Sequence, residues 1–129
     1  MAFTINLKMD NTDFPLVSFD YSIQRDLDHY SGKPAGTPKG GEIRVSRLST
    51  KDHKFYTWSI NTAEKKSGSI SFAEAGSDKT MKTLTFENGY ITQYSESCAE
   101  GMAMQESFVI SAEKIKMGDG PTLDRKWSA

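Results

Sequence analysis

The sequence predicts a mainly β, antiparallel fold of about seven strands with one α-helix and a long loop between the second and third strands. Three observations predict it. Apolar and polar residues alternate with a period of two along most of the chain, one segment alone has a helical period, and most connections are too short for parallel crossovers. The 129 residues suffice for a single domain, 1–129, with its own core.

The first three strands are expected before residue 50. Apolar residues occupy every second position of 3–9, and a second alternation follows over 17–23. Pro15 precedes this second alternation, and proline is compatible with a strand only at its start or at a sheet edge. Ile43 and Val45 mark a short third strand.

One helix is expected at about 51–65. Phe55 and Trp58 are three residues apart, which places them on the same helix face. Ser49 or Thr50 is a suitable N-cap for this segment. We expect the two aromatic side chains to dock the helix onto the sheet.

The period of two returns in the second half of the chain, over 69–72, 83–87, 90–94 and 108–117. The dipeptide Asn88-Gly89 predicts a two-residue hairpin turn, because both positions tolerate positive φ. A further turn is expected at 76–79. The last long strand stops at 118–121, where a C-terminal tail, 118–129, begins.

Composition and motifs do not favour catalysis or cofactor binding. Two His and one Cys are too few for a Cys/His zinc site, and a single Cys cannot form an internal disulfide. Cys98 lies among acidic residues, which disfavour a reactive thiolate. No phosphate-binding glycine motif is present. We therefore predict no enzyme, no cofactor, and no catalytic or metal-binding residue.

Charge and hydropathy also argue against nucleic acid and membrane insertion. The formal net charge is -1, and the basic residues within 33–47 are interspersed with acidic ones. No stretch approaches the length of apolar sequence needed to cross a bilayer. The first residues alternate apolar with polar and do not form a secretory signal peptide, so we expect synthesis in the cytosol.

The stretch 26–41 has no usable period and is too long for a simple connector. Prolines stiffen it, and Leu27 and Tyr30 give it apolar surface, so we predict an arm that packs on something outside its own domain.

Polar residues are expected on the strand faces opposite the core, where they form a polar wall without adhesive apolar surface: Thr83, Thr85, Thr92, Ser107 and Ser111. These features favour self-association through uncovered strand edges. The alternative is a monomeric β-barrel domain that binds a small ligand or carbohydrate in a barrel mouth.

The succession of motifs resembles a known family over roughly residues 3 to 127. The order runs from the N-terminal strand pair through the arm Gly32-Lys33-Pro34 to Gly40-Gly41-Glu42-Ile43, and then the single helix. It continues through the segments 82–91 and 106–115. This order is similar to that of the type VI secretion tube protein, called Hcp or TssD, in the branch found in Bacteroidetes. The loop from Ser97 to Ala103 matches nothing in that pattern.

The resemblance implies an antiparallel two-sheet, β-barrel-like fold with one flanking α-helix and an extended loop between strands 2 and 3. It also implies a homohexameric ring, with rings stacked into a hollow tube inside a contractile sheath. It implies as partners the protein itself, the tube spike, the sheath and effectors carried in the lumen. It also implies assembly in the cytoplasm, followed by secretion to the extracellular space or a target cell without a signal peptide. The positions carried over for the self-assembly loop are Gly32, Lys33, Pro34, Gly40 and Gly41, which join Leu27 and Tyr30.

Overall fold

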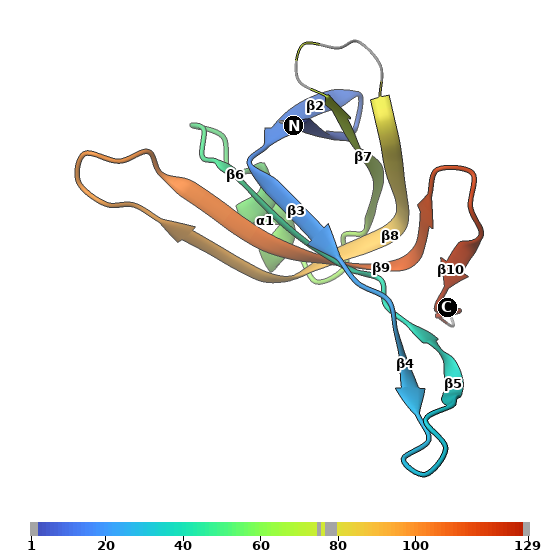
Figure 1. Cartoon of the computed structure of the whole chain (residues 1–129). Helices are drawn as coiled ribbons and strands as arrows, with labels where there is room; N and C mark the ends of the chain where they lie inside the picture. The colour runs from blue at the N-terminus through green and yellow to red at the C-terminus, as the bar shows by residue number, and fades with distance from the viewer. Residues whose placement is uncertain (1–2, 75, 77–79, 128–129) are drawn as a thin grey trace.

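In the computed structural model, which describes residues 3–74, 76 and 80–127, the chain forms one curled antiparallel sheet and a separate hairpin (Figure 1). Seven strands of the sheet follow one another in the order β2-β1-β7-β8-β9-β6-β3, and β10 pairs with β9. Their bounds are β1 Phe3–Met9, β2 Thr12–Leu16, β3 Ser18–Tyr21, β6 Glu42–Leu48, β7 Lys66–Glu74, β8 Thr80–Ser97, β9 Gln105–Met117 and β10 Thr122–Asp124. The predicted mainly β, antiparallel, barrel-like class is confirmed.

The sheet curls because its two end strands are consecutive in the chain. β2 pairs with β1 at one end of the order, and β3 pairs with β6 at the other. Only Val17 separates them, and its amide already donates to the carbonyl of Ser46 at 2.8 Å. Pro15 lies in β2, an edge strand, as predicted, because an edge position does not need its missing N–H. Val17 and Ile23, at the ends of the predicted second strand, are about half exposed.

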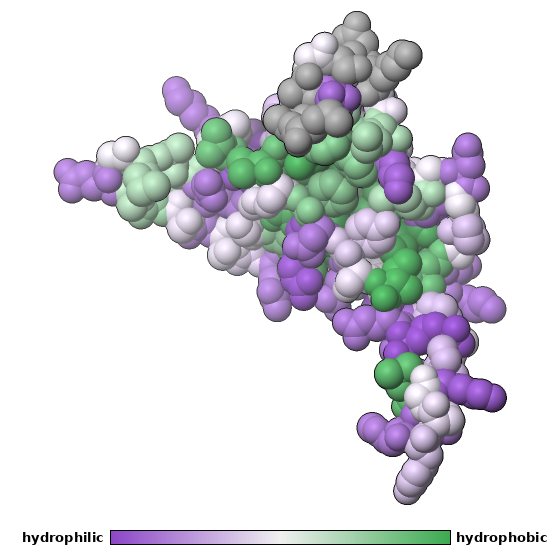
Figure 2. All heavy atoms as spheres, viewed as in Figure 1, coloured by the Kyte–Doolittle hydropathy of each residue, from purple (hydrophilic) through white to green (hydrophobic). Residues whose placement is uncertain are grey.

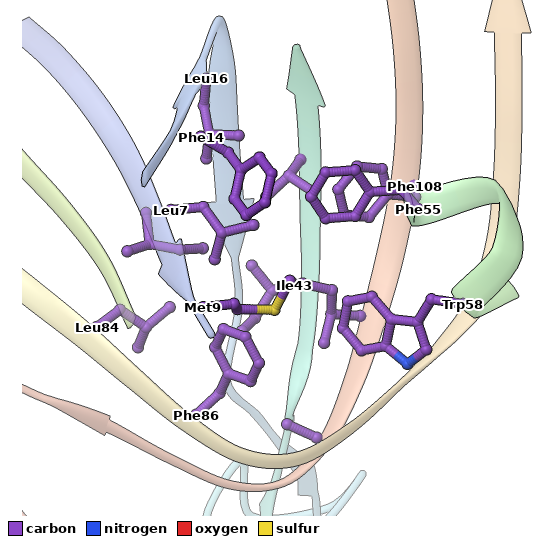
Figure 3. Close-up of a cluster of buried hydrophobic side chains, with 14 of the residues drawn as sticks. Leu7, Met9, Phe14, Leu16, Ile43, Phe55, Trp58, Leu84, Phe86 and Phe108 are labelled. Carbon is purple, nitrogen blue, oxygen red and sulfur yellow. The ribbon is translucent and has the colours of Figure 1, made fainter. Parts of the chain in front are cut away.

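The core fills the inside of the curl, and the helix α1, Lys54–Ile60, lies against it (Figure 3). Phe55 and Trp58 are each 1% exposed, and the Phe55 ring stacks on Phe108 with centroids 4.5 Å apart. The largest other fully buried side chains come from the strands: Leu7, Ile43, Ile70, Leu84, Phe86 and Ile110. The docking role predicted for the helix aromatics is confirmed.

The helix is shorter than the expected 51–65. It begins after His53, whose side chain makes no cap hydrogen bond, and ends at Asn61, which has extended backbone angles. The Asn61 side chain accepts the amide of Ala63 at 3.1 Å, which closes a local turn in place of another helical turn. The predicted caps at Ser49 and Thr50 are therefore wrong.

The predicted hairpin turn at Asn88-Gly89 is also wrong, because β8 runs through it as one strand of 18 residues. Asn88 has φ of 57°, and its amide group donates to Glu113 at 2.8 Å. The next buried residue of β8 after Phe86 is Gly89, three residues further on instead of two. The regular alternation is therefore interrupted, and the strand bends here. A Cβ at Gly89 would stand 2.8 Å from Ile110. Positive φ serves a bend within the sheet instead of a chain reversal.

The predicted long loop is an ordered hairpin for most of its length. β4, Gln24–Leu27, pairs antiparallel with β5, Pro34–Lys39, and we call residues 24–39 the arm. Every arm residue is exposed, so neither strand has a buried face that would produce a period of two. Of the turn expected at 76–79, residues 77–79 lie outside the described residues. The predicted tail contains the short strand β10.

Candidate assembly surfaces

The arm projects from the sheet and is held by its own polar contacts (Figures 1 and 2). At its turn, the amide of Asp28 donates to the carbonyl of Lys33 at 2.8 Å, and the carboxylate of Asp28 accepts the amide of Tyr30 at 2.9 Å. This backbone hydrogen bond lowers the pKa of Asp28. Near the base, Lys39 and Asp26 form an ion pair at 2.8 Å. The arm is thus locally ordered without contributing to the core.

The predicted self-assembly residues fall into two groups along the arm. Leu27 is 60% exposed and Tyr30 is fully exposed, so both present apolar surface that the chain does not cover itself. Gly32, with φ of 74°, and Lys33 complete the turn, and Pro34 begins β5. The remaining two residues, Gly40 and Gly41, lie at the base, away from the turn.

The arm base is tightly packed, which explains its glycines. A Cβ at Gly40 would stand 2.9 Å from the carbonyl oxygen of Ser22. Gly41 has φ of 96°, and a Cβ there would stand 2.7 Å from the carbonyl oxygen of Ala112 and 2.8 Å from Cδ of Arg125. Arg125 in turn donates to the hydroxyl of Ser111 at 2.8 Å. The C-terminal segment therefore packs over the point where the arm leaves the sheet.

A polar wall covers the outer face of four neighbouring strands, β3, β6, β9 and β8. One row across it consists of serines that are paired in register: Ser18, Ser46, Ser107 and Ser95. The next row contains Asp20, Arg44, Val109 and Gln93. An open groove of about 630 Å³ runs over these rows. Of the residues predicted for a polar wall, Ser107 and Ser111 lie on β9 and Thr92 on β8 in this region, whereas Thr83 and Thr85 precede the bend of β8.

Both sides of this wall are strand edges. β3 is the last strand of the sheet order, and β7 pairs with β8 no further than Gly89. Residues 90–97 of β8 therefore have β9 as their one strand partner among the described residues. Unpaired N–H and C=O groups along such edges can pair with strands of another chain.

Beyond the bend, β8 and β9 form a long hairpin, residues 90–111, which we call the distal hairpin. It is anchored close to its turn by a buried ion pair between Arg47 of β6 and Glu106 of β9, both 3% exposed. Tyr94 donates its hydroxyl hydrogen to Glu106 at 2.6 Å, and the Arg47 guanidinium lies over the ring of Phe55, 4.6 Å from its centre. Burial, and then the hydrogen bond to Glu106, raises the pKa of Tyr94. Asp52 adds a second carboxylate, 3.3 Å from Arg47.

The turn of the distal hairpin, residues 98–104, was not singled out from the sequence as functional. We call it the tip. It contains Cys98, which is exposed, and Met102 and Met104, which are 73% and 41% exposed. Gly101, with φ of 79°, and an amide-to-carbonyl hydrogen bond from Met102 to Ala99 at 3.0 Å shape the turn. Two exposed Met residues directly after the glycine of a turn are the signal that could have marked it.

Within residues 3–74, 76 and 80–127, no group of three or more His, Cys, Asp or Glu side chains is placed to hold a metal ion. No helix among the described residues is long and apolar enough to cross a membrane.

The chain thus combines a curled sheet, a polar wall with open strand edges and a projecting arm (Figure 1). The sequence profile of the hemolysin coregulated protein Hcp (TssD) matches residues 1–128, and the chain belongs to this family. Family members are structural tube proteins that the type VI secretion system secretes, and the fold implies an inner tube subunit that self-associates and has no catalytic role.

Solved structures agree with this assignment. Hcp1 from Flavobacterium johnsoniae is 31% identical, with a TM-score of 0.87 over 94% of this chain and 98% of that one. Hcp1 from Salmonella typhimurium is 14% identical, with a TM-score of 0.75 over 95% and 92% of the two chains, and is similar in fold. A chain of the PVC sheath–tube complex of an extracellular contractile injection system has the same fold at 16% identity and a TM-score of 0.64, over 88% and 86%. No curated protein sequence matches.

Proposed function

We propose that this chain forms homohexameric rings that stack into the hollow inner tube of a type VI secretion system. The tube assembles in the cytoplasm and is exported, on contraction of the sheath, to the extracellular space or a target cell. Its partners are further copies of the chain, the tube spike, the sheath and effectors held in the lumen.

The observation that carries the ring is the four-stranded wall with an open edge on each side. Three successive antiparallel pairings make β3 and β8 run in opposite directions. Rotation about a ring axis preserves strand direction, so β3 of one copy meets β8 of the next as an antiparallel neighbour. The contact uses two different edges, and such head-to-tail contacts close into rings.

The wall's chemistry supports its facing the lumen. Its serine row offers small hydroxyl side chains, and its next row offers charged and amide groups, with Val109 almost covered at 9% exposure. A surface of this kind has no large apolar patch on which a passing protein would stick. Transport of effectors through a tube needs such a wall.

The arm supports stacking between rings. Leu27 and Tyr30 expose apolar surface on a hairpin that does not serve the core, and exposed apolar surface of this kind marks interaction sites. We assign the arm residues Leu27, Tyr30, Gly32, Lys33 and Pro34 to contacts with neighbouring subunits or the next ring. Gly40 and Gly41 set the arm's point of departure.

The ring is tested by size exclusion with light scattering and by negative-stain microscopy of the purified full chain. We expect ring particles of six chains, and a strictly monomeric species at high concentration would contradict the proposal. Thr92 is the bulged residue of β8 without a partner on β9, so Thr92→Pro should leave the internal pairing intact while disturbing the open edge. Rings should be lost in Thr92→Pro and retained in Thr92→Ala.

A further inference from the structure

The two ends of the polar wall differ in what they carry. At one end, Glu42 of β6 pairs with Ser111, next to the arm base. At the other end, Leu48 of β6 pairs with Gln105, where the tip begins. The arm base and the tip therefore lie at opposite ends of the same four strands (Figure 1).

The tip end is acidic and partly apolar. Between Ile91 and Glu113 the chain has no Lys, Arg or His, and its charged residues are all Glu. Glu96 and Glu100 are exposed, and neither takes part in an ion pair among the described residues. With the exposed Met102 and Met104, the tip combines negative charge with flexible apolar side chains, which adapt well to a binding surface.

The arm-base end has an open groove of about 850 Å³ between β5 and the C-terminal segment. Its basic lining residues are Lys39, Arg44, Arg125 and Lys126, against the two acidic residues Glu42 and Asp124. Lys39 and Arg44 already pair with acidic neighbours, whereas Arg125 and Lys126 enter no ion pair within the described part of the chain. Pro38 and Leu123 supply apolar surface.

We propose that the tip of one copy inserts into the arm-base groove of a copy in the next ring. The inference rests on the stacking of rings proposed above and names the contact. Rings that stack with the same orientation bring the tip end of one against the arm-base end of the other. The negative charge of the tip end then faces the positive charge of the groove, and Met102 contacts the apolar residues that line the groove. The contact joins two different surfaces, so it repeats without limit along a stack.

Cross-linking tests the contact directly, because Cys98 is the single cysteine of the chain and lies in the tip. Thr37 lines the groove and is exposed, so Thr37→Cys adds one thiol at the proposed partner surface. Oxidation of stacked Thr37→Cys rings should give a covalent ladder on a denaturing gel. The wild-type chain, Thr37→Cys with Cys98→Ser, and Thr62→Cys, at an exposed site near the helix, should give none. Rings that stack but give no ladder with Thr37→Cys would overturn the inference.

Charge exchange gives an independent test by sedimentation of stacked rings. Glu96→Lys with Glu100→Lys should raise the concentration needed for stacking by about tenfold or more, because like charges then face each other. Lys39→Glu with Lys126→Glu should do the same, and all four changes together should restore stacking. Lys8→Glu with Lys65→Glu, both exposed and not lining the groove, is the matched control and should stack as the wild type does.

The two proposals fail in different ways. Ring formation is measured first, by light scattering on each variant. Absence of six-chain rings in the wild type contradicts the proposed function. Rings that form and stack equally well in the two charge-reversed pairs and in the combined variant contradict the tip-to-groove contact alone.

Discussion

Two hairpins project from the sheet, and they are held in different ways. The arm is exposed along its whole length and is ordered by turn hydrogen bonds and one surface ion pair. The distal hairpin continues two core strands, pairs with β6 along its β9 side and is fixed close to its turn by the buried Arg47–Glu106 pair. Both hairpins project, but the contacts of the arm are separate from the core, whereas the distal hairpin is strongly coupled to it.

The two kinds of attachment suit different functions. A hairpin with no buried face can be altered at its turn without cost to the fold, which suits a contact surface. A hairpin that is anchored in the core close to its turn transmits any displacement to the sheet, because the packed interior does not deform freely. Mutations at equivalent distances from the core should therefore have unequal effects on stability, and four predictions test this, from the largest effect to the smallest.

Glu106→Ala should destabilise the chain most. It leaves the buried guanidinium of Arg47 with Asp52 as its remaining carboxylate partner, and loss of one member of a buried ion pair costs about 3–5 kcal/mol. Urea unfolding of the wild type and of Glu106→Ala gives the difference in free energy of unfolding. Glu96→Ala, on the same hairpin but exposed, should cost less than about 1 kcal/mol. Equal costs for the two variants would show that the distal hairpin is not anchored by the Arg47–Glu106 pair.

Gly41→Ala, at the arm base, is compared with Gly36→Ala, within the arm. The new Cβ would stand 2.7 Å from a carbonyl oxygen in a backbone conformation that favours glycine, and we expect a loss of about 2–3 kcal/mol. Gly36→Ala is the control, because Gly36 has φ of 74° but no atom within 4 Å of the added Cβ. It should cost about 1 kcal/mol, the conformational penalty alone. Thermal or urea unfolding measures both, and a smaller loss for Gly41→Ala would contradict the packing of Arg125 over the base.

Tyr94→Phe should change the response of stability to alkaline pH. The pKa of Tyr94 is raised above its usual value of 10.0, because the phenol is partly buried and donates to Glu106. The folded state therefore holds this proton more tightly than the unfolded state, so the contribution is fully present below about pH 10 and is lost as the pH rises above it. Urea midpoints measured from pH 8 to pH 11 should fall less steeply for Tyr94→Phe than for the wild type. Parallel curves would contradict the assigned environment.

Removal of the arm should affect stability least. Gln24 and Lys39 pair across the base, so residues 25–38 can be replaced by a two-residue Asn-Gly turn. All of the removed side chains are exposed, and we expect a change below about 0.5 kcal/mol together with a loss of ring stacking. A shortened chain that is folded but stacks normally would remove the arm from the assembly contact. A chain that fails to fold would show that the arm supports the core.

Sequence patterns predicted the parts of the fold that have one buried face. The alternations over 3–9, 43–45 and 108–117 correspond to β1, β6 and β9, and Phe55 and Trp58 were correctly expected to dock the helix. The patterns gave no strand for the arm, because strands exposed on both faces have no hydrophobic period. They also gave no role to the tip, although the family resemblance correctly indicated the class of protein.

What the sequence determined by itself was the β class and the core positions, because alternation and burial are local properties of each strand. What only the tertiary structure decided was how Asn88-Gly89 and residues 98–104 are used. Asn88 tolerates positive φ in a hairpin turn and in a strand bend alike, and packing of Gly89 against Ile110 selects the bend. The chain reversal then moves to the tip, where no core contact constrains the turn. Local preference allowed both arrangements, and the long-range pairing of β8 with β9 chose between them.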